Sequence, residues 1–159
     1  MDNSTLEDRL SRFGLFEGFA QAELQQICGF VKEKTYRSGR ILFHQGDPPD
    51  AFFLVENGSV RETGRNDDDD VVLRRTVDQH GYLAHRALMQ GLAHEATAIS
   101  AESSLLLTIK ADDFQTLLAM FPRLQERLRR IHVINRLLAL PLFGGFPLEQ
   151  LIHVADLAQ

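Results

Sequence analysis

The 159-residue sequence lacks several features that would assign it to a definite functional class. Its single cysteine, Cys28, excludes an internal disulfide bond. It has no run of 18 or more apolar residues and no leader that resembles a signal peptide, so a cytoplasmic protein without a membrane segment is expected. Excess positive charge is also missing. The formal net charge of −5 argues against direct contact with nucleic acid.

Catalytic motifs are missing as well. The sequence contains no nucleophile with a placed base and no glycine-rich phosphate loop between a strand and a helix. Cys28 lies in a helical apolar stretch, which is typical of a buried and unreactive thiol. The acidic run Asp67 to Asp70 could chelate calcium loosely, but adjacent carboxylates lack the alternating ligands of calcium loops. The sequence therefore predicts neither an enzyme nor a metal site.

The periodicity of apolar residues divides the chain into three regions. Residues 1–30 show helical spacing interrupted once, which predicts two short helices. Residues 31–110 are short runs of β-branched and aromatic residues separated by turn signals. After Lys110 helical spacing returns, with Asp112 or Asp113 as the expected cap. These patterns predict an α+β, mainly β, fold: an antiparallel β-barrel or jelly roll with N-terminal helices and a long C-terminal helix.

The segment "RSGRILFHQGDPPDAFFLVENGSV" carries a more specific signal. Gly39, Gly46 and Gly58 fall at turns between predicted strands, and Phe43, Phe53 and Val55 alternate as inward residues. Over residues 13–138 the chain resembles the cyclic nucleotide-binding domain family, the sensor module of catabolite-activator-type regulators, kinase regulatory subunits and gated channels. The resemblance implies a regulatory domain that is not catalytic, spanning residues 1–140.

The helix expected at 121–140 carries an apolar seam. Leu124, Leu128, Ile131, Ile134 and Leu138 follow one another at steps of four, three, three and four residues. The seam could pack against its own domain, or it could form a homodimer, as the resemblance implies. Both alternatives remain open from the sequence.

The C-terminal segment repeats the N-terminal one. "LFEGFAQAELQQICGFV" from Leu15 and "LFGGFPLEQLIHVADLA" from Leu142 align without gaps. Self-similarity at one domain length predicts that residues 141–159 form the first helix of a second, downstream domain of the same kind. The alternative is a C-terminal helix that folds back as a simple cap.

The stretch "GYLAHRALMQGLAHEATAIS", from Gly81 to Ser100, aligns with the phosphate-binding cassette of the family. The frame of the cassette is retained, because Ala87, Ala96 and Thr97 match the family pattern. The resemblance implies that His85 stands in place of a glutamate that binds the ribose. It likewise implies that His94 stands in place of an arginine that clamps the cyclic phosphate. The candidate pocket residues are Gly81, Leu83, Ala84, His85, Arg86, Ala87, His94, Glu95, Ala96 and Thr97.

Four departures from the pattern oppose binding of an ordinary cyclic nucleotide. Loss of a buried charged partner of a phosphate costs about 2–5 kcal/mol, and loss of a charge-assisted ribose bond about 1.5–3 kcal/mol. Glu95 is expected to repel an anion, and Ala84, in place of glycine, to crowd the ligand. The sequence therefore predicts a regulatory or interaction module without a cofactor, for which a cyclic nucleotide is a disfavoured ligand.

A ligand sensor of altered specificity is the alternative function. It rests on His85 and His94, which the cassette geometry should bring near one another. Another nucleotide or a small anion could bind there, and anion binding should strengthen below about pH 6.5, where histidine becomes charged. A transition metal would need three or four ligands, and this spacing matches no metal motif.

Overall fold

The computed structural model describes residues 5–138, and the side chains of residues 5–130. The chain divides into two compact units after Leu117. The first unit contains three short helical segments at its N-terminus, α1 (Leu6–Ser11), the 3₁₀ segment η1 (Gly14–Phe16) and α2 (Gln21–Cys28). The predicted pair of short helices is confirmed, and the interruption between them is the 3₁₀ turn. Thr5 caps α1 by accepting a hydrogen bond from the Asp8 amide at 3.2 Å.

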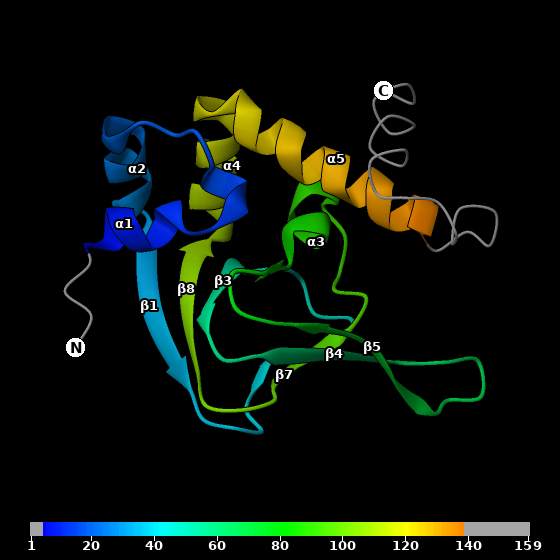
Figure 1. Cartoon of the computed structure of the whole chain (residues 1–159). Helices are drawn as coiled ribbons and strands as arrows, with labels where there is room; N and C mark the ends of the chain where they lie inside the picture. The colour runs from blue at the N-terminus through cyan, green and yellow to red at the C-terminus, as the bar shows by residue number, and fades with distance from the viewer. Residues whose placement is uncertain (1–4, 139–159) are drawn as a thin grey trace. The chain divides into compact units, whose positions relative to one another are not determined.

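Eight strands follow and form two antiparallel four-stranded sheets (Figure 1). One sheet has the order β1-β8-β3-β6 and the other has the order β2-β7-β4-β5. The strands are β1 (Val31–Tyr36), β2 (Ile41–Phe43), β3 (Ala51–Asn57), β4 (Val60–Arg65), β5 (Val71–Val77), β6 (Tyr82–Leu83), β7 (Thr97–Ser100) and β8 (Ser104–Lys110). The predicted jelly roll at 31–110 and its α+β, mainly β, class are confirmed.

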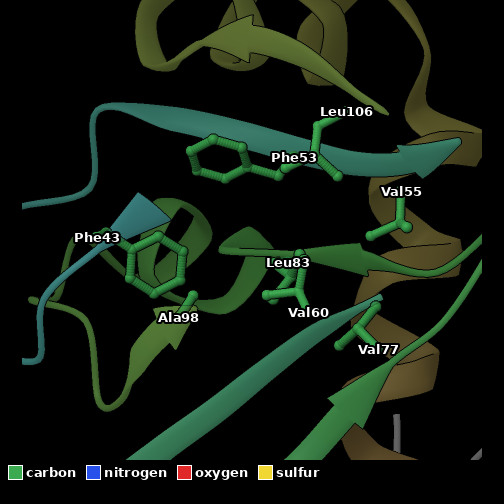
Figure 2. Packing of buried hydrophobic residues seen from close by; sticks show 8 residues of the cluster. All are labelled: Phe43, Phe53, Val55, Val60, Val77, Leu83, Ala98 and Leu106. Atoms are coloured by element: carbon green, nitrogen blue, oxygen red, sulfur yellow. The ribbon is translucent and has the colours of Figure 1, made fainter. Parts of the chain in front are cut away.

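The core of the barrel is apolar and is shared by both sheets. Alternate residues of β3, Phe53 and Val55, point into it, and they meet Phe43 from β2 as the alternation predicts (Figure 2). The other members of the cluster are Val60, Val77, Leu83, Ala98 and Leu106. Leu83 belongs to the short strand that leads into the cassette. The barrel core therefore fixes the start of the candidate site.

Glycine is required at the turn between β3 and β4. Gly58 has a φ of 96°, and a Cβ atom there would lie 2.3 Å from the Ser104 hydroxyl. Only glycine combines this backbone angle with so close a neighbour. Gly39 and Gly46 also have positive φ angles, of 84° and 93°. The predicted role of these glycines at turns is confirmed.

A charged cluster ties α1 to the first sheet. The Arg9 guanidinium donates to both carboxylate oxygens of Glu56 on β3, with Nη2 2.5 Å from Oε2. Its Nη1 lies 2.6 Å from a carboxylate oxygen of Glu33 on β1. These carboxylates raise the pKa of Arg9 further above its usual value. The N-terminal helix is therefore fastened to two strands by one side chain.

Two helices follow the barrel, α4 (Ala111–Met120) and α5 (Pro122–Leu138). The expected cap was wrong, because α4 already begins at Ala111 and both Asp112 and Asp113 lie inside its first turn, where they favour the positive end of the helix dipole. The predicted long helix is confirmed as α5. Leu124 and Leu128 of its seam are buried within the chain, whereas the other seam side chains and the repeat at 142–159 lie outside the described residues.

Candidate functional site

The cassette keeps its backbone shape despite the alanine in it. It consists of β6, the six-residue helix α3 (His85–Gln90) and, after a loop, β7. Ala84, just before α3, has a φ of 74°, in the left-handed region that glycine adopts without strain. Gly91 ends the helix with a φ of 65°. Ala84 was expected to crowd a ligand. The structure adds that the alanine itself is held in a conformation suited to glycine.

His85 is buried, with 6% of its surface exposed. Its ring packs edge-on against Tyr82 of β6, with ring centroids 5.0 Å apart. Burial raises the pKa of Tyr82 to about 12, although Arg75 opposes the shift, so this phenol stays neutral. Neither the imidazole nor the neighbouring phenol carries a negative charge. A hydrogen bond from a ribose hydroxyl to this imidazole would therefore be weaker than one to a carboxylate.

His94 is buried more deeply, with 4% of its surface exposed. It stacks on Phe43 with centroids 3.7 Å apart and an angle of 10° between the rings. Its amide donates to the Asp47 carbonyl and its carbonyl accepts from the Gly46 amide, both at 2.9 Å. The loop after β2 therefore holds the His94 backbone on both sides.

The imidazole of His94 is kept uncharged by its surroundings. Burial lowers its pKa below the usual value, and Asp50, Asp47 and Glu62 offset only part of this effect. Within the described part of the chain, its Nε2 atom is buried and has no hydrogen-bond partner. The predicted strengthening of anion binding therefore moves to a lower pH than the 6.5 expected from an ordinary histidine.

Glu95 forms an ion pair within the cassette. Its carboxylate accepts a hydrogen bond from the Arg86 guanidinium at 2.9 Å, and both side chains are about half exposed. Arg86 and water reduce the field of the carboxylate. Repulsion of an anion by Glu95 stays a prediction. The same ion pair holds the only arginine of the cassette at the surface.

The remaining predicted site residues pack inside the cassette or hold its backbone in place. Leu83, Ala87 and Ala96 are buried. Gly81 lies so close to Val77 that a Cβ atom would come within 2.5 Å of its Cγ1. The Thr97 hydroxyl accepts a hydrogen bond from the Gln45 amide at 2.9 Å, which joins β7 to the loop after β2. These residues position the two histidines.

Two aromatic partners were not predicted. Phe43 was identified only as an inward barrel residue, and Tyr82 was not singled out. The alternation of β2 placed Phe43 inside, but no sequence signal pairs it with a residue 51 positions later. The Phe43–His94 stack lies where β2 pairs with β7, whereas Tyr82 and His85 are only three positions apart in the chain.

The sequence also did not indicate a cavity of about 930 Å³. Its lining includes Lys32 and Lys34 of β1, Lys110 of β8, and Asp112 and Asp113 of α4. Because its lining contains both lysines and carboxylates, the cavity has no clear preference for an anion. None of its lining residues belongs to the cassette.

Further predictions can be compared with the described residues. Among them no group of three or more metal-ligating side chains is found, and none of their helices has the length and apolar content needed to cross a membrane. Cys28 is half-buried rather than buried, and desolvation raises the pKa of its thiol to about 11. Such a thiol is almost entirely protonated at neutral pH, which agrees with the expected low reactivity.

Comparison with known proteins identifies related chains. The family model described as "Cyclic nucleotide-binding domain" matches residues 33–121. A cyclic nucleotide-gated potassium channel of Mesorhizobium japonicum is 27% identical over 122 residues, which are 77% of this chain and 32% of the channel. The chain thus spans about a third of that relative's length.

Solved structures share the fold. The regulatory subunit of a cAMP-independent protein kinase A from Trypanosoma brucei superposes with a TM-score of 0.74 at 16% identity, covering 80% of this chain and 46% of that one. The corresponding subunit from Trypanosoma cruzi, bound to guanosine, gives a TM-score of 0.72 at 15% identity, covering 77% and 43%. At these identities the similarity establishes the fold alone.

Proposed function

Because this chain belongs to the cyclic nucleotide-binding domain family, we propose that it is a regulatory module that has lost ordinary binding of cyclic AMP and cyclic GMP. Relatives in this family include a gated channel and a kinase regulatory subunit, in which the domain is one part of a longer chain. We place this module likewise in a larger, cytoplasmic protein, where it acts on neighbouring domains. It has no catalytic role of its own and no direct contact with nucleic acid.

One observation carries the proposal. At the position where the resemblance expects an arginine to clamp the phosphate, His94 is buried, uncharged and stacked on Phe43. An uncharged imidazole offers a cyclic phosphate at most a neutral hydrogen bond, whereas an arginine offers two charged ones. The arginine of the cassette, Arg86, is half exposed and paired with Glu95, so it does not replace the missing cation.

The magnitude of the loss supports weak or absent binding. Truncation of one partner of a buried charge pair costs about 2–5 kcal/mol, and every 1.4 kcal/mol is about tenfold in affinity. His85 in place of glutamate removes a second charged contact. The Trypanosoma brucei neighbour gives a parallel, because it belongs to a cAMP-independent kinase and a triple mutant of it was bound to cAMP in the A site.

Calorimetric titration of the 159-residue chain with cyclic AMP and cyclic GMP tests the proposal. We expect no heat of binding at low micromolar concentrations of either nucleotide. A matched triple variant, Ala84→Gly, His85→Glu and His94→Arg, restores the family pattern and should gain at least tenfold in affinity for one of the two. Low-micromolar binding by the wild-type chain would contradict the proposal.

The second candidate function is a sensor for an uncharged nucleoside or a small anion that uses His85 and His94. A neutral, aromatic environment at the phosphate position favours a ligand without a phosphate, and the Trypanosoma cruzi neighbour was bound to guanosine. Titration with guanosine, adenosine and inorganic phosphate separates the two candidates. Saturable binding of a nucleoside that is lost in His94→Arg would support the sensor. Absence of binding to all three compounds would support the module without a ligand.

We further propose that the chain is part of a tandem arrangement. The self-similarity between the segments that begin at Leu15 and Leu142 supports a second domain that begins at about residue 141. The helix at 121–140 would then connect the two domains, or it would form a homodimer through its seam. The burial of Leu124 and Leu128 within the single chain leaves these two residues unavailable to a homodimer.

A further inference from the structure

The outer edge of β5 is unpaired and apolar. In its sheet β5 is an end strand, bonded to β4 on one side only. Three successive residues at its start are exposed, Val71 at 62%, Val72 at 37% and Leu73 at 60%. The hairpin that β5 forms with β4 extends away from the rest of the two sheets (Figure 1). Natural proteins usually protect such an edge, because its free amides and carbonyls can pair with another strand.

The direction of the free backbone groups follows from the hairpin pairing. The Asn66 amide donates to the Asp70 carbonyl at 3.0 Å, so this pair is a hydrogen-bonded one. Antiparallel pairs alternate in type, and the register places Arg65 opposite Val71, Gly64 opposite Val72 and Thr63 opposite Leu73. Val71 and Leu73 therefore direct their amides and carbonyls to the free edge, while Val72 is bonded toward β4.

A second copy of β5 fits this edge in antiparallel orientation. We propose that two copies of this chain associate through β5, with Val72 of one copy opposite Val72 of the other at a two-fold axis. Val71 of each copy then lies opposite Leu73 of its partner. Both of these residues have outward-facing backbone groups, so each such pair makes two backbone hydrogen bonds. On one face of the paired strands the four exposed Val71 and Leu73 side chains cover one another.

The charges on either side of the apolar residues are complementary in this register. The sequence "DDVVLRR" places acids before Val71 and arginines after Leu73. Antiparallel pairing about Val72 brings Asp70 of one copy to Arg74 of the other, at the point where a bulge between Leu73 and Arg75 interrupts the pairing of β5 with β4. Asp69 has a φ of 63° and belongs to the turn, so the regular pairing ends at Asp70. Shifting the register by two residues in either direction would set charged residues against valine or leucine. The antiparallel arrangement also separates the two acidic turns, which lie at opposite ends of the paired strands.

The residues on either side of the apolar segment do not block this pairing. Asp70 and Arg74 are exposed, and the Arg74 side chain lies over Gly64 on β4. Arg75 donates to Glu62 of β4 at 2.8 Å, so its charge is already paired within the hairpin. A partner of unrelated sequence would have to match the same order of acid, apolar and basic residues. A second copy of the chain supplies that order by symmetry.

Cysteine crosslinking tests the geometry directly in the full chain. In a Cys28→Ser background, Val72→Cys places two thiols at a non-hydrogen-bonded pair, where Cα atoms are about 4.5 Å apart, a separation that a disulfide can span. We expect this variant to form dimers at least tenfold faster than Leu92→Cys, which places a thiol at a more exposed position outside the hairpin. Val71→Cys should crosslink more slowly than Val72→Cys, because two Val71 residues are not opposite each other.

Charge reversal provides a test that does not depend on cysteine. In the Val72→Cys chain, Arg74→Glu or Asp70→Lys should slow crosslinking several-fold, and the double exchange Asp70→Lys with Arg74→Glu should restore the rate. Circular dichroism of each variant verifies that the fold is retained. Equal rates for Val72→Cys and Leu92→Cys, or a double exchange that fails to restore the rate, would overturn the proposal. A dimer in sedimentation analysis that is insensitive to both reversals would assign self-association to another surface, such as α5, and would overturn it too.

Discussion

At the scale of single residues, burial determines what His94 can do. The side chain has lost its access to water, and the stack on Phe43 suits the neutral imidazole. A protonated imidazole here would lose its hydration by water. The attraction of Asp50, Asp47 and Glu62 offsets only part of that loss. The family pattern has a charged arginine at this position, whereas the surroundings of His94 favour a neutral side chain.

The lowered pKa of His94 predicts a loss of stability in mild acid. As the pH falls below about 6.5, the unfolded chain takes up a proton on this histidine while the folded chain does not, so folding becomes less favourable. The free energy of unfolding should therefore decrease as the pH falls from 6.5 toward the folded-state pKa, by about 1.4 kcal/mol for each unit of pKa difference. Urea unfolding between pH 5 and 8 measures it.

The control for this prediction is a pair of histidine variants. His94→Phe keeps a ring against Phe43 and removes the titrating group, so its stability should vary less with pH than that of the wild-type chain. His44→Phe replaces an exposed histidine in the loop after β2 and should retain the wild-type dependence. Equal pH dependence in all three proteins would contradict the role given to His94.

The sequence identified the residues of the cassette but not their environments. His85 and His94 were found because two positions of a familiar pattern were occupied by unexpected residue types. Phe43 could not be found in this way, because it meets His94 only where β2 pairs with β7. The ion pair of Glu95 was missed for a related reason. The sequence shows its charge, whereas the contact with Arg86 across the cassette depends on where α3 ends.

At the scale of elements, the attachment of α1 depends on one arginine. The side chains of Arg9 and Glu56 are 17% and 14% exposed, so their ion pair is largely shielded from water. A shielded ion pair stabilises a fold no more than well-packed apolar residues at the same positions would. Loss of one partner is costly, however, because it leaves the other charge unpaired. The attachment is therefore more sensitive to single than to paired substitutions.

Substitution of Arg9 should detach α1 from β3. We expect Arg9→Met to lower the free energy of unfolding by on the order of 2 kcal/mol, because Glu56 is then left without its partner. The double variant Arg9→Met with Glu56→Leu should recover most of this loss. Glu33→Gln, which changes a half-exposed partner, should cost well under 1 kcal/mol. Urea denaturation gives all three values, and a double variant as unstable as Arg9→Met would contradict the prediction.

Element types were predictable from the sequence, and their ends were less so. Turn glycines and the alternation of Phe43, Phe53 and Val55 defined the barrel from Val31 to Lys110, as observed. The start of α4 was misplaced because Asp112 and Asp113 are as common in a first helical turn as at a cap. The 3₁₀ turn between α1 and α2 was interpreted as a plain interruption, because its three residues have no distinct pattern.

At the scale of the whole molecule, the domain boundary remains a prediction. If residues 141–159 begin a second domain, a chain that ends at Leu140 should retain the melting temperature of the 159-residue chain within about 2 °C. If the segment instead folds back as a cap on the barrel, its removal exposes apolar surface. A loss of 1 kcal/mol lowers the melting temperature of a domain of this size by several degrees. Differential scanning calorimetry of the two chains distinguishes these outcomes.

The Phe43–His94 stack also has a consequence for signalling. In a two-state sensor, a ligand shifts the populations only as far as it binds one state better than the other. Here the wall beside the cassette is ordered by two rings of the chain and by backbone bonds to the loop after β2. Folding alone therefore establishes this wall in one conformation. If the domain has lost its cyclic nucleotide, as we propose, a signal that passes through it arrives by protein contact at an edge or a helix.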